Sequence, residues 1–200
     1  MPPSQSSTSR TYLLLYNITS SLLWLRILTT VVTSHSNPSI YITVEPWTRW
    51  TQTLAMVEIL HAATGITRAP IFTTFTQIFA RSVQVWAINY GFPGVTATSS
   101  AYPAMLFAWS TADVVRYFYF AVLLTGVSVP GVLKWLRYSL FIILYPIGIG
   151  SEWWLMYQAT TVTESPVVAG IFYFCLALYG PGSVMMYSYM VKQRGKTLSR

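Results

Sequence analysis

SLFIILYPIGIGSEWWLMY, residues 139–157, is the segment that most clearly indicates the fold class. It is largely apolar and nearly as long as the ~20 residues that a helix needs to cross a bilayer. Within it, residues 144–152 hold a proline, two glycines, a tyrosine and a glutamate. Proline and glycine weaken a helix, and a carboxylate is costly in lipid. The segment therefore predicts a membrane helix and raises the question of why it carries these residues.

The composition extends the membrane interpretation to the whole chain. Of the 200 residues, 54% are hydrophobic and only 8% are charged, whereas a soluble domain carries about 25% charged residues. The net charge is +7, and in membrane proteins such a surplus collects in cytoplasmic loops, so it does not indicate nucleic-acid binding. Cys175 is the only cysteine, which excludes an intrachain disulfide and a multi-cysteine metal site.

Six apolar windows have about the length of a membrane span: 12–33, 47–66, 70–90, 101–125, 133–157 and 166–191. They predict an all-α integral membrane protein, a bundle of six transmembrane helices. We expect one membrane domain over residues 12–191, between a short N-terminal tail (1–11) and a basic C-terminal tail (192–200).

The basic residues predict the orientation of this bundle. They gather in the connectors 66–70 and 126–137 and in the C-terminal tail, whereas the alternate connectors hold Arg49 alone or no basic residue. By the positive-inside rule both termini then lie in the cytosol, which agrees with an even number of spans. The formal glycosylation sequon at Asn17 should stay unmodified in this orientation.

Several ionisable residues fall inside the predicted spans: Arg26, Glu58, Arg81, Asp113, Arg116, Arg137 and Glu152, with Gln77 beside them. Such residues are rare in membranes and normally face the bundle interior, so each is a candidate functional residue. The alternative is that they form interhelical ion pairs, for example Glu58 with Arg81. Ion pairs alone do not account for the composition of residues 144–152.

Tyr145 and Glu152 are seven residues apart, which places them on one face of a helix about 10 Å apart along its axis. Pro146 removes a backbone hydrogen bond, and Gly148 and Gly150 remove side-chain bulk, so a thin ligand could lie beside this helix. A phenol and a carboxylate that face one slot can act as general acid and general base. The alternative is a Pro-Gly kink with a stabilising glutamate, and the spacing leaves both interpretations open.

Two other chemistries are excluded by the sequence. HAATGITR (61–68) has the His-x6-Arg frame of a tyrosine-phosphatase loop, but Ala62 occupies the nucleophile position and Cys175 lacks the following arginine. His61 and His35 are too few for a metal centre. The sequence therefore predicts neither phosphatase activity nor a metal site.

Six segments, taken together, resemble the very-long-chain 3-hydroxyacyl-CoA dehydratases, the family once called protein-tyrosine-phosphatase-like. They occur in the family order and cover nearly the whole chain: YLLLYN (12–17), LAMVEILHAATGI (54–66), TQIFARSVQVW (76–86), WSTADVVRYFYF (109–120), LRYSLFIILYPIGIGSEWW (136–154) and YGPGSVMMYSYMVKQRGK (179–196). Three features depart from the family: Asp113 replaces a common Glu, Ala62 replaces a frequent Cys, and the tail lacks a terminal dilysine signal.

The resemblance implies six spans in the endoplasmic reticulum membrane and the third step of fatty-acid elongation, which dehydrates a (3R)-3-hydroxyacyl-CoA to the trans-2-enoyl-CoA. No cofactor is expected, because the thioester already acidifies the C2 proton. The expected partners are the acyl-CoA substrate, membrane lipid and other enzymes of the elongation cycle. The competing function is a non-catalytic membrane scaffold or a small transporter, although no pair of broken helices in matching halves is evident.

The resemblance also implies site residues. Tyr145 and Glu152 occupy the catalytic positions of the family. Our preferred assignment makes Glu152 the base and Tyr145 the acid, since a phenol is protonated at neutral pH, and the reverse assignment remains open. The remaining matches are supporting or substrate-binding positions: Glu58, Gln77, Arg81, Arg116, Arg137 and Gly148.

Overall fold

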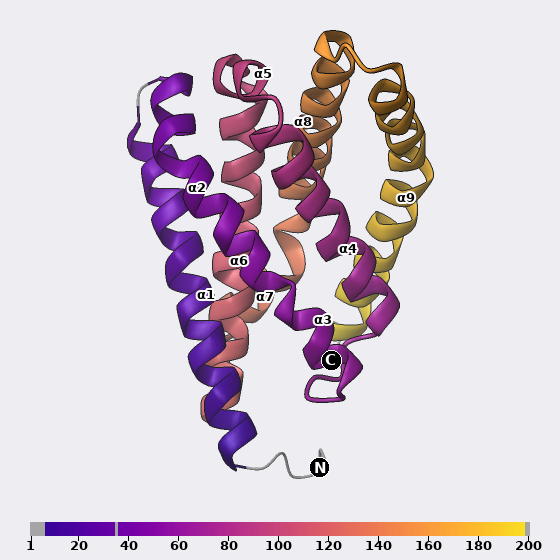
Figure 1. Cartoon of the computed structure of the whole chain (residues 1–200). Coiled ribbons are helices and arrows are strands. Elements are labelled where there is room, and N and C mark those ends of the chain that lie inside the picture. The colour runs from indigo at the N-terminus through magenta and orange to yellow at the C-terminus, as the bar shows by residue number, and fades with distance from the viewer. Residues whose placement is uncertain (1–6, 35, 199–200) are drawn as a thin grey trace.

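The computed structural model describes residues 7–34 and 36–198, and these residues form a helical bundle with no strand among them (Figure 1). The helices, in chain order, are α1 (Ser7–Thr33), α2 (Asn37–Ala55), α3 (Val57–Ala63), α4 (Ile71–Val83), the π-helix η1 (Gln84–Tyr90), α5 (Pro93–Thr98), α6 (Ala101–Thr125), α7 (Gly131–Ser139), α8 (Phe141–Val162) and α9 (Pro166–Leu198). The predicted all-α class is confirmed.

Three helical stretches are long and apolar enough to cross a membrane: Ser7–Thr33, Gly131–Val162 and Pro166–Leu198. Large apolar side chains such as Leu15, Phe72 and Phe174 point outward and are 60%, 70% and 65% exposed. An outward apolar surface is expected of a bundle whose surroundings are lipid. The chain is therefore an all-helical membrane protein.

The predicted windows and the helices differ in continuity. Three windows correspond to single helices (α1, α6 and α9). Two of the others contain a break, at Met56 and at Leu140, and the third changes from α-helix to π-helix at Gln84. α2 begins at Asn37, ten residues before the window predicted at 47–66. Hydropathy therefore located the helices but did not show where they are interrupted.

Both ends of the chain are more helical than the predicted tails. α1 begins at Ser7 and α9 continues to Leu198, so each helix extends into residues that the sequence analysis assigned to a tail. Residues 1–6, 199–200 and His35 lie outside the described part of the chain.

α6 is the central helix, and its most extensive contacts are with α1 and α8. α8 in turn lies beside α9, which runs in the opposite direction (Figure 1). The core where α1, α6 and α8 meet is made of fully buried apolar side chains: Trp24, Ile27, Met105, Leu106, Leu155 and Met156. These three helices with α9 form the frame that positions the polar residues.

α8 passes Pro146 without interruption, although the sequence analysis expected the proline to weaken the helix there. The break lies six residues earlier, at Leu140, where α7 ends and the Leu140 carbonyl accepts hydrogen bonds from the N–H groups of Ile143 and Leu144 at 3.1 and 3.0 Å. The segment 144–152 is therefore a continuous helix that can present Tyr145 and Glu152 at a fixed spacing.

Candidate active site

Glu152 lies in the middle of α8 and faces the interior of the bundle, where it is only 6% exposed. One carboxylate oxygen, Oε1, accepts a hydrogen bond from the indole N–H of Trp109 on α6 at 2.7 Å. The other, Oε2, accepts a hydrogen bond from the hydroxyl of Tyr179 on α9 at 3.0 Å. Three helices therefore meet at this carboxylate.

Tyr145 lies two turns before Glu152 on α8 and is half-buried. Its hydroxyl donates to the backbone carbonyl of Ser183 on α9 at 3.4 Å. Ser183 follows Tyr179 by one turn, so a single face of α9 contacts both Glu152 and Tyr145.

A shallow groove of about 370 Å³ runs between α8 and α9 beside Tyr145, and Glu152 is not among its lining residues. The surface of this groove is mostly apolar. Its lining residues are Tyr145, Pro146, Ile149, Ser183, Val184, Tyr187 and Ser188. The ring of Tyr145 forms part of its wall and packs against Tyr187, with the ring centroids 6.0 Å apart. The groove has the chemical character that an acyl chain requires.

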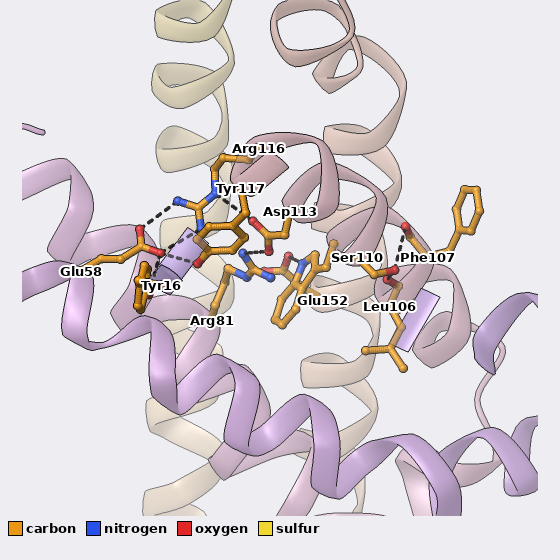
Figure 2. Close-up of polar contacts among 11 residues, drawn as sticks. Tyr16, Glu58, Arg81, Leu106, Phe107, Ser110, Asp113, Arg116, Tyr117 and Glu152 are labelled. Carbon is orange, nitrogen blue, oxygen red and sulfur yellow. Dashed lines mark hydrogen bonds and ion pairs between the residues drawn. The ribbon is translucent and has the colours of Figure 1, made fainter. Parts of the chain in front are cut away.

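A chain of alternating charges leads from α3 toward Glu152 (Figure 2). Arg116 donates two hydrogen bonds to Glu58, at 2.9 and 3.2 Å, and a third to Asp113 at 3.0 Å. Asp113 also pairs with Arg81, whose Nη1 lies 2.7 Å from Oδ2. The expected pair of Glu58 with Arg81 is therefore wrong, because Arg116 and Asp113 stand between them.

The tyrosines Tyr16 and Tyr117 complete the surroundings of Glu58. Both hydroxyls donate to its Oε1, that of Tyr16 at 3.2 Å. Glu58 thus accepts hydrogen bonds from side chains of α1 and α6. This carboxylate is fully engaged in holding helices together.

Arg81 joins the ion pairs to Glu152. Its guanidinium carbon lies 4.1 Å from the ring centroid of Trp109 and 5.1 Å from that of Trp24, within the range of a cation–π contact. Figure 2 shows Arg81 between Asp113 and Glu152. Trp109 therefore has Arg81 over its ring while its N–H points to Glu152.

Gly148 lies on the face of α8 that packs against Trp109 and Ala108 of α6. A Cβ atom at this position would lie 3.6 Å from Cδ1 of Trp109 and 3.7 Å from the Cβ of Ala108. In place of the ligand suggested by the sequence, Trp109 occupies the space beside Gly148. Gly150 differs, because a Cβ there would meet no heavy atom within 4 Å.

The remaining predicted residues lie farther out. Gln77 on α4 is exposed, and its amide lies 4.0 Å from the sulfur of Met186 on α9. Arg137 on α7 packs near the rings of Phe120 and Tyr138, with centroid distances of 5.8 and 5.5 Å. Among the described residues, no salt bridge joins Arg137 to the series of ion pairs from Glu58 to Arg81.

The sequence analysis overlooked two residues in direct contact with Glu152, Trp109 and Tyr179. Both lie in segments that carry the family resemblance, WSTADVVRYFYF and YGPGSVMMYSYMVKQRGK. A signal was available, since a tryptophan N–H or a tyrosine hydroxyl buried in an apolar span needs an acceptor. Glu152 is such an acceptor.

Comparison with known proteins shows which family has sequences similar to this chain. The family model described as "Protein tyrosine phosphatase-like protein, PTPLA" matches residues 52–200. The chain is 35% identical to the probable very-long-chain (3R)-3-hydroxyacyl-CoA dehydratase of Schizosaccharomyces pombe, and the match covers 94% of this chain and 93% of the relative.

Two further relatives carry similar names. The chain is 33% identical to the very-long-chain (3R)-3-hydroxyacyl-CoA dehydratase PASTICCINO 2B of Oryza sativa, over 98% of this chain and 96% of that protein. It is 30% identical to the human very-long-chain (3R)-3-hydroxyacyl-CoA dehydratase 2, over 94% of this chain and 81% of that protein. No solved structure matches the chain. The chain belongs to the protein tyrosine phosphatase-like (PTPLA) family, as its sequence segments predicted.

Proposed function

We propose that this protein is a very-long-chain (3R)-3-hydroxyacyl-CoA dehydratase with Glu152 and Tyr145 as its catalytic pair. The observation that carries the proposal is the placement of a buried carboxylate and a phenol on one helix, where both contact α9 and the phenol lines an apolar groove. The names of relatives that are 30–35% identical over most of the chain support the same reaction. A scaffold or transporter would have no need for such a pair.

The chemistry of the dehydration requires one base and one acid. The base removes the proton at C2, which the thioester acidifies, and the electron pair of that C–H bond becomes the C2–C3 double bond. The C3–O bond breaks, and the leaving hydroxyl takes a proton from the acid and departs as water. The reaction changes no oxidation state of the molecule as a whole, so these two side chains suffice without a cofactor.

Glu152 is assigned as the base and Tyr145 as the acid. A carboxylate is an acceptor when ionised, and a phenol carries a proton that it can donate at neutral pH. After one turnover Glu152 holds the proton and Tyr145 lacks one, so a transfer between them restores the resting state. The reverse assignment uses the same two residues and predicts the same products.

The groove between α8 and α9 is assigned to the acyl chain. Its apolar lining suits a hydrocarbon tail, and Tyr145 lies in its wall. A chain lying in this groove would carry its C2 and C3 atoms past Tyr145 toward Glu152. The coenzyme A head, which is highly charged, would remain at the end of the bundle.

The membrane arrangement belongs to the same proposal. Six crossings of the endoplasmic reticulum membrane with both termini in the cytosol agree with the basic connectors. The first turn of α1 and the last turns of α9 lie toward the same end of the bundle, which supports an even number of crossings (Figure 1). Other enzymes of the elongation cycle are the proposed partners.

The proposal is tested by incubating purified protein in detergent with a very-long-chain (3R)-3-hydroxyacyl-CoA and, separately, with its (3S) epimer. We expect the (3R) substrate to lose one water and yield the trans-2-enoyl-CoA, detected by mass spectrometry, with activity retained in the presence of a metal chelator. Binding of the acyl-CoA without formation of the enoyl-CoA would favour the scaffold or transporter.

A further inference from the structure

We propose that Trp109 and Tyr179 are positioning residues that hold the Glu152 carboxylate in the orientation needed for proton transfer. The inference rests on the proposed role of Glu152 in the dehydration, and it adds two residues to that site. Neither residue belongs to the series of ion pairs that runs from Glu58 to Arg81. Each donates a hydrogen bond to a different oxygen of Glu152.

The geometry of the two contacts fixes the carboxylate. The donors come from α6 and α9, on either side of α8, at 2.7 and 3.0 Å from Oε1 and Oε2. Rotation of the carboxylate about its last side-chain bond would break both hydrogen bonds. Hydrogen bonds to an ionised acceptor are stronger than neutral ones, particularly where water is excluded. Glu152 is 6% exposed and Trp109 is also 6% exposed, so this condition is met.

Both donors have further contacts, and Tyr179 packs against the hydrophobic core of the bundle. Trp109 is packed against Gly148 on one side and has Arg81 4.1 Å from its ring centroid. Tyr179 lies one turn before Ser183, whose carbonyl accepts the hydroxyl of Tyr145. The same face of α9 therefore orients both members of the catalytic pair, and Trp109 fixes Glu152 from α6.

This arrangement leaves Glu152 able to act as a base. Each carboxylate oxygen has two lone pairs, so a single donor on each oxygen leaves one lone pair to receive the C2 proton. Catalysis by a base depends on its distance and angle to that proton, so a small displacement of the carboxylate lowers the rate strongly. Loss of either donor should therefore slow the chemical step more than it weakens substrate binding.

The two donors also affect how readily Glu152 is ionised. A hydrogen bond donated to a carboxylate stabilises its charged form, so removing one should move the acidic limb of the rate profile to higher pH. The other charged or titratable groups near Glu152 are Arg81 of α4 and Tyr145 of α8. An ordinary phenol does not titrate in the acidic limb.

The test compares Tyr179→Phe and Trp109→Phe with the parent protein. We expect kcat to fall about 10- to 100-fold in each, the size of losing one hydrogen bond to a charged group, while KM stays within about twofold because substrate binding is not the target. The acidic limb of kcat/KM should shift to higher pH. Tyr179→Phe removes a single hydroxyl, so it remains informative if Trp109→Phe fails to fold.

Matched controls come from the lipid-facing surface. Tyr173→Phe removes a hydroxyl from α9 where the side chain is 53% exposed, and Trp135→Phe makes the same exchange on α7 where the side chain is 52% exposed. Both should retain parent activity and the parent pH profile. Thermal unfolding in the same detergent checks that all variants are folded.

Two results would overturn the inference while leaving the base assignment intact. One is a folded Tyr179→Phe with parent kcat and an unshifted acidic limb, beside an inactive Glu152→Gln. The other is a fall in kcat that is accompanied by lost thermal stability and no shift of the acidic limb, which indicates a structural role. Parent activity in Glu152→Gln would instead overturn the proposed base and the inference with it.

Discussion

At the scale of single residues, charge balance organises the polar interior of the bundle. Glu58, Arg116, Asp113 and Arg81 alternate in sign, so each charge lies beside an opposite one. An unpaired charge in this setting would be strongly unfavourable. The chain of ion pairs therefore holds α3, α4 and α6 together and supports Trp109 through Arg81.

Neutralising Glu58 should destabilise the fold. Glu58→Gln keeps the size of the side chain but removes the charge that faces Arg116 and weakens the acceptor of two tyrosine hydroxyls. We expect a loss of about 1.5–3 kcal/mol in the free energy of unfolding, measured by denaturant titration in detergent. Glu164→Gln, an exposed position between α8 and α9, is the control. Equal stabilities would mean that the ion pairs contribute nothing.

The sequence predicted which residues matter in this interior better than it predicted their partners. Glu58, Arg81 and Arg116 stood out because ionisable residues in an apolar span require an explanation. Their pairing depends on which faces of α3, α4 and α6 meet, and the spacing of residues along one helix does not contain that information. The wrong pairing of Glu58 with Arg81 follows from this gap.

At the scale of helices, hydropathy predicted length but not continuity. α2 begins before its apolar window because Pro38 sits at the start of the helix, where proline is favourable, and because Glu45 pairs with Arg49 one turn later at 3.0 Å. Because the charges of Glu45 and Arg49 neutralise each other, α2 can extend through this polar segment. The breaks at Met56 and Leu140 have no comparable signal in composition.

At position 148, where α8 packs on α6, there is room for a Cβ atom but not for a large side chain. Gly148→Ala should retain activity and stability, because its Cβ would make ordinary contacts at 3.6–3.7 Å and alanine favours a helix by about 1 kcal/mol over glycine. Gly148→Leu should displace Trp109 and lower kcat at least about tenfold. Gly150→Leu, where a Cβ meets nothing within 4 Å, is the size-matched control and should stay active. Comparable activity in both leucine variants would contradict this role.

At the scale of the whole molecule, the frame of α1, α6, α8 and α9 carries the proposed catalytic pair on α8, with Glu152 deeper in the bundle than Tyr145. Counting from Phe141, where α8 begins, Tyr145 lies about 6 Å and Glu152 about 16 Å along the helix axis. The hydrogen bond from Arg194 to the hydroxyl of Ser139, at 3.1 Å, brings the end of α9 beside α7. Basic residues from both segments therefore gather at one end of the bundle.

The proposed orientation predicts the accessibility of both termini. Tags fused to either terminus should be digested by protease in sealed microsomes, and Asn17 should carry no glycan. Asn17 is also 8% exposed, with its side-chain amide donating to the Leu13 carbonyl at 2.7 Å. Protection of one terminus alone would mean an odd number of crossings.

The basic end of the bundle should bind the phosphates of coenzyme A. Changing Lys134 and Lys192 together to glutamine should raise KM for the acyl-CoA with a smaller effect on kcat, since ground-state and transition-state binding are lost alike. High salt should reproduce the defect in the parent protein, because exposed charges are screened beyond about 8–10 Å. An unchanged KM in the double variant would place the coenzyme A head elsewhere.

The most direct test of the account compares the parent protein with Glu152→Gln and Tyr145→Phe in the dehydration of a (3R)-3-hydroxyacyl-CoA. Each substitution removes one ionisable or proton-bearing group with little change in shape. Glu152→Gln also weakens the acceptor of two hydrogen bonds, so thermal unfolding in the same detergent checks that both variants are folded. We predict that each loses turnover by at least about 100-fold, the lower range of general acid–base catalysis. Dehydration at the parent rate by both folded variants would contradict the account and leave residues 144–152 with only a structural role.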